Sequence, residues 1–362
     1  MANTGQTARG HNYRGALAIQ TDDHTANTTD SNFWEYSMTA GVPMSTNVET
    51  ELQIADSDDA PSGYIISQAA GGGDFTVLSD PTSIGTIWKA HLGAESPASK
   101  VHTFTKTDSP LFVTGMFKRP DVVGGTDRWE QFSNAFVKTV KVSHKAGQLL
   151  EHTVSLDANT STFNVTAPVP VPGSLADGLA GDYRQRSTRI VNSSKLLTAV
   201  GSTLKLDLDA TPGATLIHNP ESIDIESSFA NWAWIQTDAL NPSSYWTKGS
   251  YKLTCTISHV FTSFDSYAQT FYGTKTVGSS MAQSSTVVYG AADFLWPIIA
   301  GTAAMSEQIK LLNMRWRVAP ASVQPSGDAV RVVLTGQTYA VTSPISVITS
   351  GDRSTTAYTN SA

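Results

Sequence analysis

The chain has 362 residues, of which 40 % are hydrophobic and 15 % charged, and its formal net charge is −7. This is the composition of a globular protein, and the acidic balance excludes a general basic surface for gripping nucleic acid. The single cysteine excludes an intrachain disulfide. We expect no signal peptide, because the first residues contain no apolar run. We also expect no membrane span, because the longest apolar stretch, from Phe294, is short and broken by Pro297.

Alternation of apolar and polar residues predicts strands through the first part of the chain. The predicted strands are 47–54 and 72–79, followed by a hairpin over 136–158 that turns near residues 145–147. Residues 80–93 (DPTSIGTIWKAHLG) predict a helix, with Asp80 as its cap, Pro81 at the first helical position and Gly93 after the last turn. The residues on one face of this helix, which we expect to pack it against the sheet, are Ile84, Ile87, Trp88 and Leu92.

Three consecutive glycines, 71–73, stand close to this helix, and glycine-rich segments beside a helix often bind phosphate. A phosphate loop, however, follows a strand and directly opens the helix. Here the strand FTVLS separates the glycines from Pro81. The glycines therefore favour a flexible start of a strand, with Phe75 and Val77 on one side of it, over a ligand loop.

The second part of the chain follows a Pro- and Gly-rich region, 167–187, which predicts a linker or extended arm. Strands are predicted at 203–209, 221–229, 250–261 and 285–290, and a hairpin over 309–337. Residues 263–273 (SFDSYAQTFYG) predict a second helix. Its sheet-facing side would carry Phe264, Tyr267 and Phe271.

Both parts contain the order strand, long loop, strand, helix, glycine and hairpin, which indicates an internal duplication. The alternative is that any long all-β chain can be aligned in this way. The predicted fold class is all-β with a few short helices. The predicted organisation is a first half over 1–166, the linker at 167–187, a second half over 188–345 and a polar tail over 346–362.

Sequence patterns that carry catalysis or metal binding are missing or weak. The chain has no GxSxG, HExxH or P-loop sequence. The acids at 56–59 lack the glycine and the distant glutamate of a calcium loop, so they favour a solvated loop. His152, Cys255 and His259 continue apolar strand faces. We expect Cys255 to be buried, and the two histidines to lie in the core or in an interface rather than to be ligands. The sequence therefore predicts no enzyme, no cofactor and no metal.

Acidic residues recur on one strand of each part. Glu49 and Glu51 share the polar face of 47–54, and Asp224 and Glu226 lie on or beside the polar face of 221–229. One interpretation is two solvated strands. The other is a repeated acidic surface in an assembly.

The chain resembles the tail tube proteins, or major tail proteins, of long-tailed bacteriophages. The acidic strand 47–54 (NVETELQI) carries part of the resemblance. Residues 71–93 are similar to the family's glycines, strand and helix ending in Leu-Gly, and 134–158 to its strand–glycine–strand signature. The second part, 250–273 and 329–337, is similar to the C-terminal part of longer members. The resemblance covers nearly the whole chain apart from the termini and 167–187, and the order of the motifs carries more weight than any single one.

This resemblance implies a tail-tube-type β-sandwich with a flanking helix, whose inner sheets join between subunits into a large β-barrel. The internal duplication would place this fold twice in one chain. The partner would be the protein itself: three chains with pseudo-sixfold symmetry, or alternatively six, complete a ring, and rings stack into a tube. Other tail proteins would contact the tube ends, and DNA would pass through without specific binding. Such a protein is made in the host cytoplasm, resides in the virion tail without a membrane anchor, and conducts the genome into the host cell.

A DNA conduit should repel phosphate. The candidate lumen-facing acids are therefore Glu49, Glu51, Asp224 and Glu226. Basic residues also lie on polar strand faces and would weaken a repulsive lining if they point into the lumen; these are Lys141, Arg315, Arg317 and Arg331.

The alternative function is a carbohydrate-binding or adhesive β-sandwich protein, for instance another virion component. Eight tryptophans and eleven tyrosines could stack on sugars. Trp88 and Trp316 lie on apolar faces and are expected in the core. Trp232 and Trp234 alternate in sequence, which suits either a binding face or an interface.

Overall fold

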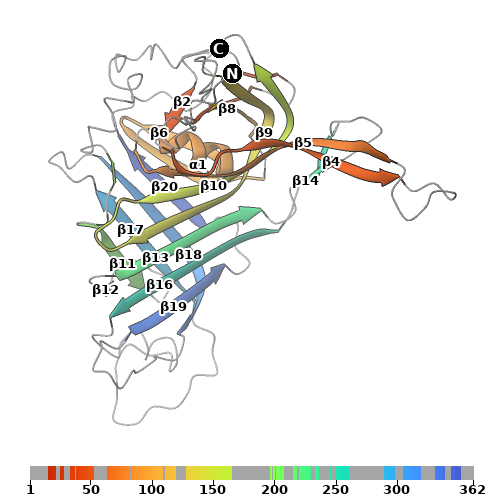
Figure 1. Cartoon of the computed structure of the whole chain (residues 1–362). Helices are drawn as coiled ribbons and strands as arrows, with labels where there is room; N and C mark the ends of the chain where they lie inside the picture. The colour runs from red at the N-terminus through yellow and green to blue at the C-terminus, as the bar shows by residue number, and fades with distance from the viewer. Residues whose placement is uncertain are drawn as a thin grey trace, which may run out of the picture.

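The computed structural model (Figure 1) describes residues 15–21, 25–27, 33–36, 38–52, 63–81, 83–108, 111–119, 128–164, 196–197, 199, 201–207, 215–217, 220–229, 233–235, 244–246, 250–260, 289–297, 305–318, 331–338 and 344–351. For residues 35, 46–52, 63–70, 119, 128, 164, 207, 215–217, 233–235 and 244–246 only the backbone is described.

The described chain is mostly β-structure, as the alternation predicts. The first strand set is β1 (Gly15–Ile19), β2 (Trp34–Tyr36), β3 (Met38–Ala40), β4 (Met44–Leu52), β5 (Gly63–Leu78), β6 (Gly93–Ala98), β7 (Val101–Lys106), β8 (Val113–Arg119), β9 (Arg128–Lys145) and β10 (Glu151–Asn164). The helix α1 (Ile84–Leu92) lies between β5 and β6 in the chain.

The second strand set is β11 (Thr203–Asp207), β12 (Thr215–Ile217), β13 (Pro220–Phe229), β16 (Tyr251–Val260), β17 (Tyr289–Pro297), β18 (Ser306–Val318), β19 (Arg331–Thr338) and β20 (Ile345–Ser350). The short strands β14 (Ala233–Ile235) and β15 (Ser244–Trp246) pair only with each other among the described strands. All the other strands belong to one large antiparallel sheet, which is not closed into a barrel.

Seven strands of each set follow the same order across the sheet. In the first set the order of hydrogen-bonded neighbours is β2–β1–β8–β9–β10–β5–β4. In the second set it is β12–β11–β17–β18–β19–β16–β13. Each strand of one order corresponds to the strand at the same place in the other, and every pairing is antiparallel. Figure 1 shows the first set in the upper part of the molecule and the second set below it.

The long strands β9 and β18 also share a bulge. The register between β8 and β9 shifts by one residue at Asn134, and the register between β17 and β18 shifts by one residue at Asn313. Both asparagines have a φ of 51°. An extra residue with left-handed backbone geometry is a common form of β-bulge, and asparagine tolerates this geometry better than most residues.

The helix α1 is buried along its whole length, and Figure 1 shows it packed in the upper part of the molecule. Ile84, Ile87, Trp88 and Leu92 are all in the hydrophobic core. The helix ends where the sequence predicts, because Gly93 has a φ of 94° and its N–H donates to the carbonyl of Lys89. The predicted start at Pro81 is wrong: the N–H groups of Ser83 and Ile84 donate to the carbonyl of Asp80, and this turn precedes the first helical residue, Ile84.

The three glycines lie inside β5, so the expectation that they begin a strand is wrong. Gly72 and Gly73 have φ values of 136° and 127°. A Cβ at Gly71 would come within 2.8 Å of the Phe132 ring, and one at Gly72 would overlap the carbonyl oxygen of Leu156. Only glycine fits this backbone. Figure 1 shows β4 and β5 projecting from the body as a hairpin, and the glycines lie on its body side, where β5 pairs with β10.

The predicted hairpin turn and the predicted polar tail both fall on described residues. The β9–β10 hairpin turns at residues 146–150, close to the predicted position, with a positive φ at Gly147. Residues 346–350, at the start of the predicted polar tail, belong to β20, which pairs with β18 and β7 and buries Val347. The linker 167–187 and the second predicted helix, with Phe264, Tyr267 and Phe271, lie outside the described residues.

Candidate assembly interface

The two strand sets join at two places. One is the pairing of β20 with β7, and the other is the pairing of β9 with β13, named here the β9–β13 seam. Thr139–Lys145 of β9 lie opposite Ser222–Ser228 of β13. β9 is 18 residues long and pairs with β8 only up to Ala135, so its last residues are left for β13. The second set thereby continues the sheet of the first without a break.

The side chain of His91 on α1 covers the inner face of the seam. Its Nδ1 lies 2.9 Å from the carbonyl oxygen of Val137 in β9, and its Nε2 lies 2.7 Å from Oγ of Ser227 in β13. Burial lowers the pKa of His91 to about 4, although the backbone hydrogen bond to Val137 opposes this. The ring is therefore neutral at pH 7, and the carbonyl fixes the proton on Nδ1. Nε2 then accepts from Ser227, whose oxygen is 2.7 Å from the Tyr251 hydroxyl and can accept its proton.

A second buried link joins the end of β9 to β17. The indole Nε1–H of Trp296 donates to Nδ1 of His144 over 2.7 Å. Burial lowers the pKa of His144, against a hydrogen bond to the backbone of Pro220 in β13. One imidazole thus contacts two strands of the second set, and its neutral form satisfies both contacts.

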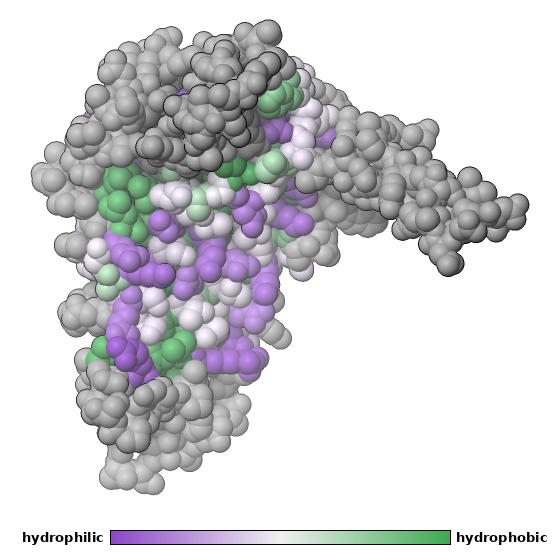
Figure 2. Space-filling model, in the orientation of Figure 1, coloured by the Kyte–Doolittle hydropathy of each residue, from purple (hydrophilic) through white to green (hydrophobic). Residues whose placement is uncertain are grey.

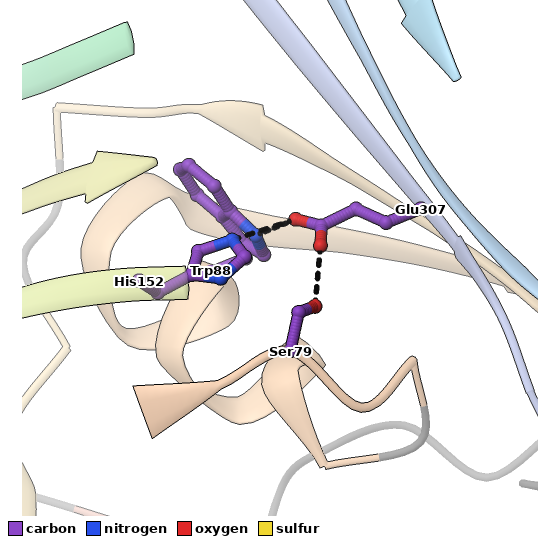
Figure 3. A network of polar contacts seen from close by, with 4 residues as sticks. All are labelled: Ser79, Trp88, His152 and Glu307. Carbon is purple, nitrogen blue, oxygen red and sulfur yellow. Dashed lines mark hydrogen bonds and ion pairs between the residues drawn. The ribbon is translucent and has the colours of Figure 1, made fainter. Parts of the chain in front are cut away.

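The third link is centred on Glu307 in β18 (Figure 3). Its Oε1 accepts from Trp88 Nε1 over 2.7 Å and lies 3.0 Å from His152 Nε2, while its Oε2 accepts from Ser79 Oγ over 2.7 Å. The three partners come from α1, from β10 and from the residue that follows β5, and all belong to the first part of the chain. Glu307 and His152 have no exposed side-chain surface.

The environment of Glu307 favours its charged form. Burial alone raises the pKa of a carboxyl, but the charge of His152 and the hydrogen bonds from His152, Ser79 and Trp88 together outweigh burial. The pKa of Glu307 therefore lies below its usual value. A buried carboxylate is tolerated only when it is paired and hydrogen-bonded, so this cluster ties β18 to the first strand set in one defined position.

The outer face of the seam carries two of the predicted acids. Asp224 lies 3.7 Å from Lys141 Nζ and accepts a hydrogen bond from Ser143 over 2.9 Å. Glu226 is opposite Lys141 in the strand pairing. Both Asp224 and Lys141 have 45 % of the side chain exposed. Figure 2 shows that the face of β13 and β16 turned to the viewer is mostly hydrophilic.

The other two predicted acids are not at the positions that correspond to these. Glu49 and Glu51 lie on β4 in the projecting hairpin, where only the backbone is described. The strand pairing instead places Asp224 and Glu226 at positions equivalent to Val42 and Met44. The structure therefore does not bring the four acids into equivalent places of the two sets.

Sequence reasoning missed the residues that make the buried links. Glu307, His91, His144 and Ser79 are not among the candidates that the sequence suggests, whereas His152, Cys255 and His259 are buried as predicted. One signal was available for Glu307, because it alternates with Ile309 and Leu311 on the buried face of its strand. A carboxylate at such a position needs a partner, but nothing in the sequence says which strand supplies it.

Within the described ranges, no three His, Cys, Asp or Glu side chains are grouped as metal ligands. No helix among the same residues has the length and apolar character needed to cross a membrane. A comparison with protein-family models finds no match for the chain, and a comparison with curated proteins finds no relative. The fold and the β9–β13 seam are therefore the basis for a functional proposal.

Proposed function

We propose that this chain is the structural subunit of a bacteriophage tail tube, with the tail-tube-type fold present twice. The observation that carries the proposal is the repeated strand order together with the β9–β13 seam. One seven-strand arrangement occurs twice, and the second copy extends the sheet of the first edge to edge. An assembly protein that builds a continuous sheet from repeated units needs this property.

Stacked rings follow if the same extension continues from one chain to the next. Two kinds of strand edge meet at the seam, one from each strand set. When each set extends the next in this way, the chain keeps one edge of each kind for pairing with other chains. If the successive extensions curve, they close into a ring, which removes the exposed edges. With two sets in each chain, three chains give the six-set ring that the family resemblance implies, and rings stack into the tube.

The outer face of the seam is the proposed lining of the tube, because α1 covers the opposite face. Its charge is mixed, since Lys141 is paired with Asp224. We therefore propose that DNA passes over a weakly acidic, hydroxyl-rich surface without specific binding.

A double substitution in virions, Asp224→Lys with Glu226→Lys, tests the proposed lining. Slower genome delivery from tails of normal length is expected, and unchanged delivery would remove Asp224 and Glu226 from the lining.

Negative-stain electron microscopy of the purified chain tests the main proposal. Stacked rings or tubes are expected at high protein concentration, and native mass spectrometry of single rings should give three chains. Rings of six chains would overturn the threefold arrangement while leaving the tube. A sample that remains monomeric at all concentrations would contradict the tail tube function.

The described tryptophans give little support to the carbohydrate-binding alternative. Five of the eight are buried and cannot stack on a sugar ring; these are Trp34, Trp88, Trp129, Trp296 and Trp316. Specific signals on a glycan array from a monomeric sample would favour that alternative.

A further inference from the structure

Among the described residues, the second strand set leaves open the edge that the first set fills at the seam. β9 pairs with β8 up to Ala135 and with β13 from Thr139 onward. β18 pairs with β17 up to Arg315. Beyond that residue, Trp316–Val318 pair with β19 on one side, and no described strand lies on the other.

In the part of the chain that the structure describes, the first strand set has the complementary open edge. β13 pairs with β16 on one side and with β9 on the other. The corresponding strands, β3 and β4, pair with β5 on one side, and the described residues supply no strand on the other. Among the described strands, each chain therefore has one open edge of each of the two kinds that meet at the seam.

A shared irregularity shows which residues correspond on β4 and β13. The pairing of β3 with β5 skips one residue within Met38–Ala40, and the pairing of β13 with β16 skips one within Pro220–Ser222. Counting along the strand from this point, Thr46 corresponds to Ser228. The strand pairings extend this alignment to β9 and β18. They lead from β5 through β10 to β9 in the first set, and from β16 through β19 to β18 in the second. Along these paths, Arg317 of β18 corresponds to Thr139 of β9.

We infer that Trp316–Val318 of one copy pairs antiparallel with the start of β4 of a second copy, with Arg317 opposite Thr46. This register repeats the seam, where Thr139 lies opposite Ser228. The inference rests on the proposed ring and names the edge that closes it. A second copy is the occupant because the chain already shows how such an edge is filled.

Exposed apolar side chains mark both edges. Met44, the first residue of β4, has 60 % of its surface exposed, and Tyr289, opposite Arg315, has 38 %. Tyr289 corresponds to Phe112 of the first set, since each stands two residues before the strand residue that faces the bulge. Phe112 is only 6 % exposed, because it belongs to a cluster with Phe229 of the second set. Pairing with another copy would cover Tyr289 in the same way.

One contact in the single chain competes with this pairing. The backbone N–H of Ser45 donates to Oε1 of Glu130 over 3.1 Å, and its hydroxyl contacts the same oxygen. Since each N–H of an antiparallel strand points to one side only, the N–H of Ser45 points away from β5, toward the open edge. Glu130 therefore accepts a hydrogen bond from a backbone N–H that would otherwise pair with a neighbouring strand. This contact protects the edge from unspecific pairing until a second copy displaces Glu130.

Disulfide cross-linking of assembled protein tests the register. The background is Cys255→Ala, which removes the only native thiol. Arg317→Cys with Thr46→Cys should form an intermolecular disulfide, because directly opposed residues have Cα atoms roughly 4.5–5.5 Å apart and a disulfide accepts roughly 4.4–6.8 Å. Arg317→Cys with Met44→Cys is the matched control. This pair is displaced by two residues, roughly 7–8 Å apart, and should cross-link at least tenfold less.

Two further samples make the test decisive. A mixture of the single variants Arg317→Cys and Thr46→Cys can cross-link only between copies, and it retains one native edge on every chain. Thr139→Cys with Ser228→Cys should give an intramolecular disulfide and serves as the positive control for the seam.

The outcomes separate the register from the function. Rings with the Arg317–Thr46 cross-link support both. Rings in which only the Met44 control, or neither pair, cross-links overturn this edge pairing and leave the tail tube function standing. A specific Arg317–Thr46 cross-link without rings or tubes supports the pairing and contradicts the proposed function.

Discussion

Asn134 of β9 and Asn313 of β18 share one backbone conformation, a φ of 51°, at the same point of two corresponding strands. At each asparagine, the strand contains one residue more than the neighbouring strand that pairs with it. Two strands of unrelated origin have little reason to carry the same bulge at the same place, because a bulge is a specific local departure from the ladder. This relationship supports the interpretation that the chain contains one fold twice.

Replacement of Asn313 tests whether the bulge geometry matters for stability. Asn313 is exposed, so burial does not complicate the comparison. Asn313→Val should lower the free energy of unfolding by about 1–2 kcal/mol, because a β-branched residue is strained at positive φ. Asn313→Gly should be close to neutral. Urea denaturation of both variants provides the measurement, and equal effects of valine and glycine would show that the backbone conformation is not the cause.

The Glu307 cluster should hold a large share of the stability. Glu307→Ala leaves Trp88, Ser79 and His152 without their buried acceptor, and loss of one member of a buried pair costs about 3–5 kcal/mol. Thermal and urea unfolding should show this loss. Glu151→Gln is the control, because that acid is only partly buried, and it should change stability by less than about 0.5 kcal/mol. Comparable losses of unfolding free energy in the two variants would show that the Glu307 cluster does not stabilise the fold more than an ordinary surface acid.

Mild acid should destabilise the fold through His91. In the unfolded chain a histidine binds a proton below about pH 6.5, whereas folded His91 has a pKa of about 4 because it is buried. Between these values the unfolded state carries more protons, so stability falls as pH falls, by up to about 3 kcal/mol. The lowered pKa of His144 acts in the same direction.

Urea denaturation at pH 7, 5.5 and 4.5 measures this slope. His91→Gln should be less stable at pH 7 and lose less on acidification, since glutamine does not titrate. Glu307 does not account for the slope above about pH 4.3: its pKa is lowered, so its contribution is lost only as pH falls through its own lower value. A wild-type stability that is constant from pH 7 to pH 4.5 would contradict the assignment of His91 as a buried neutral group.

Gly72 should be the least replaceable glycine of the triplet. An alanine there would combine a φ of 136° with a Cβ that overlaps the carbonyl oxygen of Leu156. We expect Gly72→Ala to cost more than about 3 kcal/mol or to prevent folding, in line with other severe backbone conflicts. Gly147→Ala is the control: its φ is also positive, at 76°, but its Cβ meets nothing within 4 Å, so it should cost about 1 kcal/mol. Soluble yield and thermal unfolding compare the two, and equal losses would show that the clash with β10 is unimportant.

Much of the local structure could be predicted from the sequence. The period-two alternation in 250–261 and 136–158 determined strands and their buried faces, and Gly93 determined the end of the helix, because these features depend on residues close together in the chain. The recurring order of elements was also readable before any strand pairing was known.

Tertiary structure alone decided how those elements combine. Glycines 71–73 read as the start of a strand, yet they lie inside β5, because the ring of Phe132 and the carbonyl of Leu156 approach them from strands far along the chain. Glu307 contacts Trp88 and His152, which lie more than 150 residues earlier in the chain. The seam pairs β9 with β13, which lie on either side of the Pro- and Gly-rich region 167–187 in the sequence. Alternation specifies which face of a strand is buried, but hydrogen bonding along a strand edge is made by the backbone and is nearly independent of side chains. The sequence by itself therefore determined the strands and their faces, and the partner of each edge was decided by the packing of the whole sheet.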